Sequence, residues 1–129
     1  MKPKDFINHS YHYAVVGATT NQSKYGYQVL MDLNDGDYQV VGVNPKYNEI
    51  EGISVYPSLK EVPNMPDVAV AVVPPEVGLK IIDEAKLLGI KKMWFQPGAE
   101  SEAIRQKCVA NGILAMASGA CIMIERSKL

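Results

Sequence analysis

The stretch that decides the fold is Asp67-Val68-Ala69-Val70-Ala71-Val72-Val73, which is nearly continuous in apolar residues. A strand covered by helices on both faces has this pattern, whereas a half-exposed antiparallel strand alternates apolar and polar residues. Pro74-Pro75 follows directly, and a proline both ends a strand and fits the first turn of a helix. We therefore expect a buried central strand that leads into a helix.

Strand-like and helix-like segments alternate on both sides of this stretch. Apolar runs predict further strands at residues 13–17, 38–43, 92–95 and 113–116, and a short edge element at residues 54–56. Capping signals and helical periodicity predict helices over residues 24–33, from Pro75 to a cap at Gly89, and from a cap at Ser101 to Asn111. On the second helix Val77, Ile81, Ala85 and Leu88 fall on one stripe, which we expect to face the sheet.

Repeated strand-helix-strand units imply right-handed crossovers. We therefore expect a Rossmann-like, doubly wound α/β domain over residues 1–129. Its five parallel strands are predicted in the order 3-2-1-4-5, with helices on both faces.

Length and composition agree with one globular domain. The 129 residues are 47% hydrophobic and 21% charged, and 13 basic against 14 acidic residues give a net charge of -1. A nucleic-acid-binding protein has a basic excess that is missing here. The chain has neither an apolar run near the ~20 residues of a membrane span nor an apolar leader at its start. We therefore expect a cytoplasmic protein that binds neither nucleic acid nor membrane.

The loop after the first strand is the most informative. Ligands of open α/β sheets bind outside the carboxyl ends of the strands. Gly17-Ala18-Thr19-Thr20-Asn21-Gln22 leads into a helix, where free backbone N–H groups and the helix dipole stabilise a phosphate, and Lys24 adds a cation. The alternative is a polar turn without a ligand. Three other loops are expected to follow the carboxyl ends of strands in the same way. They are Asn44-Pro45-Lys46, Val73-Pro74-Pro75 and Gln96-Pro97-Gly98.

The residues disfavour NAD as the ligand. The dinucleotide fingerprint G-x-G-x-x-G is absent, because Thr19 and Gln22 stand where the later glycines would be. An NAD site also places Asp or Glu after the second strand to hold the ribose, whereas this chain has Asn44 followed by Lys46. A lysine there suits the ribose phosphate of CoA or NADP.

Several of these stretches also carry a resemblance that covers about residues 13–125. They are, in chain order, Val15-Val16-Gly17-Ala18-Thr19, Asn21 with Lys24-Tyr25, Val43-Asn44-Pro45-Lys46, Val55-Tyr56-Pro57-Ser58-Leu59, Pro66-Asp67-Val68, Val73-Pro74-Pro75, Gln96-Pro97-Gly98-Ala99-Glu100 and Ala120-Cys121-Ile122-Met123. In order and spacing they resemble the stand-alone CoA-binding domain family. The chain is similar to the amino-terminal domain of the succinyl-CoA synthetase alpha subunit.

The resemblance implies coenzyme A as the ligand. It implies that the loop from Thr19 to Gln22 lines the pyrophosphate, with Lys24 at the position of the family's usual basic residue, and that Lys46 meets a phosphate. It also implies that Val73 and Pro74 flank the adenine and that Gln96 and Pro97 approach the pantetheine. Gly26 stands where family members commonly carry serine, which removes one expected hydroxyl contact. The predicted site residues are Gly17, Thr19, Thr20, Asn21, Gln22, Lys24, Asn44, Pro45, Lys46, Val73, Pro74, Gln96 and Pro97.

The sequence contains no recognisable catalytic or metal-binding constellation. His9 and His12 lack partners at ligand spacing, and the acidic pairs Asp83-Glu84 and Glu100 with Glu102 are expected on solvated helix surfaces. Cys108 and Cys121 are expected in the core, with a contact between Cys121 and a ligand thiol as the alternative.

We therefore expect a CoA-binding module without chemistry of its own, whose partner is CoA or acyl-CoA. Two alternatives stay open. One is an NADP- or acyl-CoA-dependent enzyme whose catalytic half comes from a protein partner or a second subunit. The other is a regulatory interaction domain without a ligand. A homo-oligomer also stays open.

Overall fold

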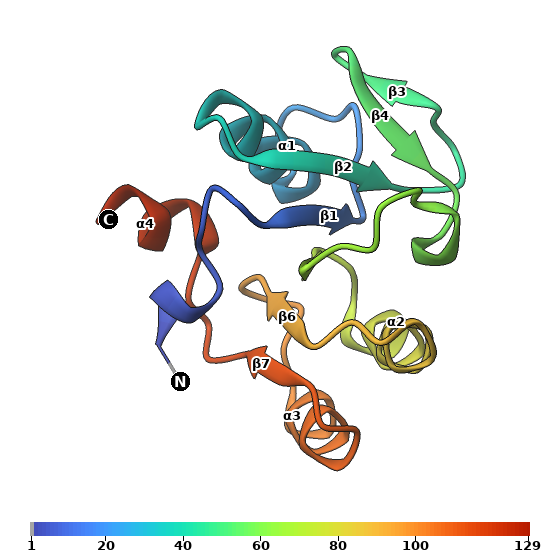
Figure 1. Cartoon of the computed structure of the whole chain (residues 1–129), viewed down its shortest axis with the longest axis vertical. Coiled ribbons are helices and arrows are strands. Elements are labelled where there is room, and N and C mark those ends of the chain that lie inside the picture. The colour runs from blue at the N-terminus through green and yellow to red at the C-terminus, as the bar shows by residue number, and fades with distance from the viewer. Residues whose placement is uncertain (1) are drawn as a thin grey trace.

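The structure is a computed structural model that describes residues 2–129 (Figure 1). Strands and helices alternate along the chain. In chain order the elements are the 3-10 helix η1 (Pro3–Asp5), β1 (His12–Val16), α1 (Tyr25–Asp35), β2 (Gln39–Val43), β3 (Glu49–Ile50), β4 (Ile53–Tyr56), the 3-10 helix η2 (Leu59–Glu61), β5 (Val68–Ala71), α2 (Pro75–Leu88), β6 (Lys92–Phe95), α3 (Glu102–Ala110), β7 (Leu114–Met116) and α4 (Ile122–Ser127).

The strands form one mixed sheet in the order β3-β4-β2-β1-β5-β6-β7. All neighbouring pairs are parallel except β3 and β4, which are antiparallel. From β1 the chain builds outward to β2 and β4, and it then returns to the other side of β1 with β5. The strand order therefore reverses between β1 and β5, and ligands of open α/β sheets bind at the carboxyl ends beside such a point.

The α/β class is confirmed, but the predicted number and order of the strands are wrong. The sheet has seven strands rather than five, because residues 49–56 add the hairpin of β3 and β4 beyond β2. The five predicted strands lie in the order 2-1-3-4-5, since β5 pairs with β1 through Val15 and Val70. The physical reason is burial: all four residues of β5 are buried and need an interior place, whereas Ser54 of β4 is exposed, as suits a peripheral strand.

Helices cover both faces of the sheet, as expected (Figure 1). Successive residues of a strand point to opposite faces. Trp94 accordingly packs with residues of α1 and α4, and Phe95 packs with residues of α2 and α3. The core is thus two apolar layers, one on each side of the sheet.

Helix α2 packs on the sheet through a stripe shifted from the predicted one. Its buried residues are Gly78, Ile82 and Ala85, so that only Ala85 of the predicted stripe is fully buried. Gly78 lets α2 lie close to α3 and to the sheet, because a Cβ there would lie 3.1 Å from Ile104 Cδ1 of α3 and 3.6 Å from Phe95 Cε1 of β6. Val77 is 39% exposed and Ile81 is half-buried as a result. The apolar side chains that this shift leaves outside the core become important at the site.

The carboxyl-terminal helix α4 was not predicted. Ile122 is fully buried against the α1 layer. Arg126 donates to the carboxylate of Asp32 on α1 through Nε at 2.7 Å and through a second nitrogen at 2.9 Å. A bidentate pair of this kind fixes orientation as well as charge, so it docks α4 firmly on α1.

No helix among residues 2–129 combines the length and the apolar character that a membrane span needs.

Candidate functional site

Two hollows lie at the carboxyl edge of the sheet, on either side of Val73. The hollow between β2 and α2 has a volume of about 240 Å³, and the hollow between Pro74 and Pro97 has a volume of about 350 Å³. Both are next to the reversal of strand order. The predicted site residues that line one or both of them are Gly17, Asn44, Pro45, Val73, Pro74, Gln96 and Pro97.

Gly17 closes the turn after β1 in a backbone conformation that glycine favours. Its φ is +99°, and a Cβ there would lie 2.3 Å from the carbonyl oxygen of Val72. Gly26, in the first turn of α1, is equally tight, since its Cβ would lie 2.1 Å from the carbonyl oxygen of Gly17. The two glycines let α1 and the chain after β5 approach the end of β1. A serine at position 26 does not fit this packing.

The hydroxyl groups of the first loop meet a residue from the loop after β2. Thr20 Oγ1 donates to the hydroxyl of Tyr47 at 3.3 Å, and Thr19 Oγ1 lies 3.4 Å from the same hydroxyl. The hydrogen bond with Thr19, followed by that with Thr20, lowers the pKa of Tyr47. Tyr47 was missed in the sequence, although it stands directly after Lys46. These three hydroxyls bring the two predicted phosphate loops together.

Asn44 ties the same two loops through both ends of its side-chain amide. Its Nδ2 donates to the carbonyl oxygen of Ala18 at 2.9 Å, and its Oδ1 accepts from the backbone N–H of Lys46 at 2.9 Å. The amide is therefore engaged within the protein, and the position of Lys46 depends on it.

The two predicted phosphate-binding lysines are exposed. Lys24 is the N-cap residue of α1, and Lys46 follows the end of β2. Neither ammonium takes part in an ion pair with any residue from 2 to 129. Asn21 and Gln22, which precede Lys24 in the first loop, are also exposed. This rim of the edge offers cations and hydroxyls to an anionic ligand.

Gln96 lies at the larger hollow, but its side chain is turned into the protein. It is fully buried, its Oε1 accepts from the backbone N–H of Ile122 at 2.7 Å, and its Nε2 lies 3.4 Å from Sγ of Cys121. Cys121 and Cys108 are both buried, as expected, and burial raises the pKa of the Cys108 thiol to about 11. Gln96 thus joins the end of β6 to the start of α4.

Some residues that line the smaller hollow were missed in the sequence. Val77, Ile81 and Glu84 lie one helical turn apart on α2, and Ser58 reaches the hollow from the other side. Glu84 was expected on a solvated surface, yet it is half-buried here, whereas Asp83 is exposed and pairs with Lys107 at 2.9 Å. The spacing 77, 81, 84 was the signal that could have identified this face of α2.

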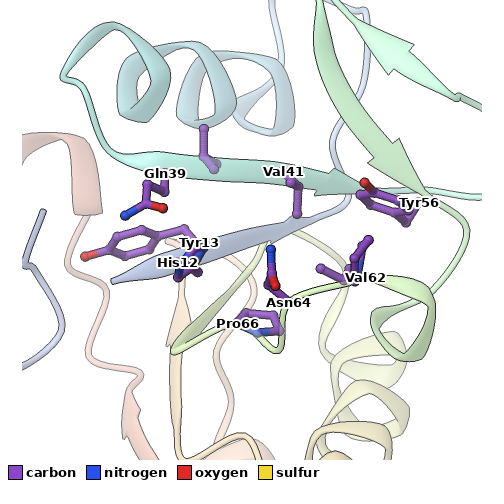
Figure 2. A pocket seen from close by; sticks show the side chains of 10 residues that line it. His12, Tyr13, Gln39, Val41, Tyr56, Val62, Asn64 and Pro66 are labelled. Carbon is purple, nitrogen blue, oxygen red and sulfur yellow. The ribbon is translucent and has the colours of Figure 1, made fainter. Parts of the chain in front are cut away.

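A separate hollow of about 320 Å³ lies against β1 and β2, where side chains of those strands and of the loop before β5 gather around it (Figure 2). It reaches the first residues of both strands, His12 and Gln39. Its lining, drawn from the described residues, includes no lysine or arginine. It therefore lacks the cations that a phosphorylated ligand needs, and the carboxyl edge remains the candidate site.

Comparisons with known proteins identify the family of this domain. The family model described as a CoA binding domain matches residues 11–127. Over 86 residues the chain is 36% identical to an ADP-forming acetate–CoA ligase of Methanocaldococcus jannaschii, covering 67% of this chain and 12% of that protein. Over 108 residues it is 31% identical to the alpha subunit of an ADP-forming acetate–CoA ligase I of Pyrococcus furiosus, covering 74% of this chain and 23% of that protein.

A solved structure of a conserved hypothetical protein from Pyrococcus furiosus matches with a TM-score of 0.84 and 49% sequence identity. The match covers 89% of this chain and 98% of that one. The chain thus spans a small part of the curated ligases but is similar to nearly all of this smaller protein. The resemblance found in the sequence is confirmed, and the chain belongs to the family of CoA-binding domains.

Proposed function

We propose that this chain is a CoA-binding module that holds CoA along the carboxyl edge of its sheet. One observation carries the proposal: the first loop and the loop of Lys46 meet at this edge, through the contacts of Thr19 and Thr20 with Tyr47. Lys24 and Lys46, which form no ion pair within residues 2–129, belong to these two loops, and two largely apolar hollows lie at the same edge. CoA has the matching parts, a phosphorylated end joined to a base and to a long, weakly polar arm.

In this proposal each region of the edge holds a part of the ligand. The pyrophosphate lies on the loop from Gly17 to Lys24, where the amino end of α1 favours negative charge. Lys46 meets the ribose phosphate. The base and the pantetheine arm occupy the hollows on the two sides of Val73, with Gln96 and Pro97 at the pantetheine side.

CoA is a substrate in this proposal, and a partner protein completes the chemistry. The relative from Pyrococcus furiosus is named as a subunit, and both curated relatives extend far beyond the matched region. We therefore propose that this module presents CoA or acyl-CoA to a catalytic partner, and that it transfers no group by itself.

Replacing Lys24 or Lys46 by alanine should weaken CoA binding by roughly ten- to a hundredfold. Charge-assisted hydrogen bonds to phosphate contribute about 1.5–3 kcal/mol each, which corresponds to that range. Both side chains are exposed, so the melting temperature without ligand should hardly change. Calorimetric titration at low and high ionic strength measures the effect, and the variants should show a smaller salt dependence than the wild type.

Lys91→Ala is the matched control, because Lys91 is an exposed lysine just before β6, at the opposite edge of the sheet. It should leave CoA affinity unchanged. If Lys24→Ala and Lys46→Ala both bind CoA as the wild type does, the site lies elsewhere. If millimolar CoA neither binds nor raises the melting temperature of the wild type, the proposed function is wrong.

Specificity for the ribose phosphate gives a separate expectation. The wild type should bind CoA more tightly than dephospho-CoA, and NAD least tightly, because Lys46 stands where an NAD site places an acidic residue. Titration with CoA, dephospho-CoA, NADP and NAD under one buffer condition gives the ranking. Tightest binding of NAD would contradict the assignment of Lys46.

A further inference from the structure

A groove lies between α3 and β7, at the end of the sheet away from β3 (Figure 1). The volume of this α3–β7 groove is about 500 Å³, which is larger than that of either hollow at the carboxyl edge. Most of its lining is apolar, yet Val109 of α3 is 81% exposed and Leu114 of β7 is 36% exposed. Apolar side chains gathered at one exposed place indicate a binding surface.

The lining of the α3–β7 groove, drawn from residues 2–129, carries one charged side chain, and that charge is already paired. Arg105 donates through Nη1 to the carbonyl oxygen of Ala117 at 2.8 Å, and its Nη2 lies 3.3 Å from the carboxylate of Glu102. Burial raises the pKa of the Cys108 thiol to about 11, so the thiol is neutral at physiological pH. The groove therefore offers no free counter-charge to a phosphate or a carboxylate, and an uncharged apolar group suits it.

The groove ends beside the larger hollow. Ala117 and Ser118 line the end of the groove that follows β7, and β7 is the parallel neighbour of β6. Neighbouring strands lie about 4.8 Å apart. Gln96, which follows β6 and lines the larger hollow, accepts from the backbone N–H of Ile122 just after the same loop. The loop after β7 thus lies against the residues that form the larger hollow.

The two hollows and the groove follow one another along the carboxyl edge. The smaller hollow lies beside the ends of β1 and β2, the larger hollow lies between the ends of β5 and β6, and the groove starts at the end of β7. This is the order of the strands in the sheet. The base, the pantetheine arm and the acyl chain of an acyl-CoA are joined in the same order. An acyl chain that continues away from Val73 therefore reaches the groove.

We propose that the α3–β7 groove binds the apolar acyl chain of an acyl-CoA whose CoA part lies along the carboxyl edge. The proposal rests on the proposed function and adds the substrate class. An apolar cavity of about 150 Å³ holds benzene, so a groove of about 500 Å³ has room for a straight chain of about eight carbons. A thioester brings no charge, whereas a free fatty acid brings a carboxylate that Arg105, already paired, does not neutralise. The groove therefore takes the chain as its CoA ester.

Calorimetric titration of the full chain with CoA, acetyl-CoA and octanoyl-CoA tests the groove. Complete burial of one methylene strengthens binding by about fourfold. Octanoyl-CoA has about six more methylenes than acetyl-CoA, and an open groove buries each only in part, so octanoyl-CoA should bind roughly ten- to a hundredfold more tightly. Its binding should also show the more negative heat-capacity change, which is the mark of apolar burial.

Two variants locate the effect. Val109→Asp places a carboxylate on the wall of the groove, away from both hollows, so it should reduce the advantage of octanoyl-CoA to within about threefold and leave the affinity for CoA unchanged. Ala115→Leu fills the groove with an uncharged side chain and should have the same effect, which separates lost space from repulsion. Leu87→Asp is the matched control, because Leu87 is 89% exposed on α2 outside the groove, and it should keep the full advantage.

Octanoyl-CoA that binds no more tightly than acetyl-CoA would overturn the acyl groove and leave CoA binding intact. Free octanoate that binds with the same dependence on Val109 would overturn the assignment to a CoA ester. A wild-type dimer that Val109→Asp separates in sedimentation velocity would also overturn the proposal, because a second copy would then cover the groove. Failure of the wild type to bind any of the three CoA ligands would instead reject the proposed function.

Discussion

Val70→Asp should abolish the folded state under ordinary buffer conditions. Val70 is fully buried in β5, at the centre of the sheet, and its neighbours in register are Val15 and Trp94. None of these can pair with a carboxylate. Burying an unpaired carboxylate costs several kcal/mol, against a total stability of about 5–15 kcal/mol. Circular dichroism and urea denaturation measure the loss.

Val109→Asp on α3 is the control for this change. Val109 is 81% exposed, so the same substitution there should shift the urea midpoint very little. A monodisperse Val70→Asp protein with the melting curve of the wild type would contradict the placement of β5 in the interior of the sheet.

Gly26→Ser should destabilise the fold by about 3 kcal/mol and lower the melting temperature by roughly 10 °C. The new Cβ would lie 2.1 Å from the carbonyl oxygen of Gly17 and 3.3 Å from Thr19 Cγ2. Gly17 cannot move away easily, because it is itself held against the carbonyl of Val72. The strain also displaces the first loop, so CoA affinity should fall with stability. Thermal unfolding and titration measure the two effects.

Two further variants separate the causes. Gly26→Ala should be as harmful as Gly26→Ser, because the clash arises at Cβ. Gly119→Ala gives the cost of a positive φ alone, since Gly119 has a φ of +88° and nothing within 4 Å of its Cβ position. It should cost about 1 kcal/mol. A Gly26→Ser protein as stable as the wild type would show that α1 does not pack against Gly17 as described.

The sequence predicted the class of fold because each strand carries its own burial pattern. The run from Val68 to Ala71 is apolar on both faces, and that property alone identifies an inner strand. It does not identify the neighbours of the strand, since every inner place in the sheet satisfies it equally. The order was therefore wrong at β5. The helix stripe on α2 was misassigned for a related reason, since Gly78 carries no hydrophobic side chain although it is buried against Ile104 and Phe95.

The loops of the site could be predicted from local signals, and several of their contacts could not. A glycine at the end of a strand, followed by hydroxyl residues and a lysine, indicates a phosphate loop within a few residues of sequence. Tyr47 meets Thr20 across 27 positions of the chain, and Glu84 lines the same hollow as Ser58 because α2 packs through the face of Gly78. Such contacts depend on the tertiary arrangement: the spacing 77, 81, 84 marks one face of a helix, but it does not show what that face meets.

The side chain of Gln96 has a practical consequence for how the protein is handled. It lines the larger hollow and holds the backbone of Ile122, the first residue of α4, while Arg126 holds the last turn of α4 on α1. Shortening the chain before α4 would leave a buried amide without its partner beside the ligand, and a bulky fusion on the last residues would pull on the same contact. Affinity tags and immobilisation chemistry therefore belong at the amino terminus.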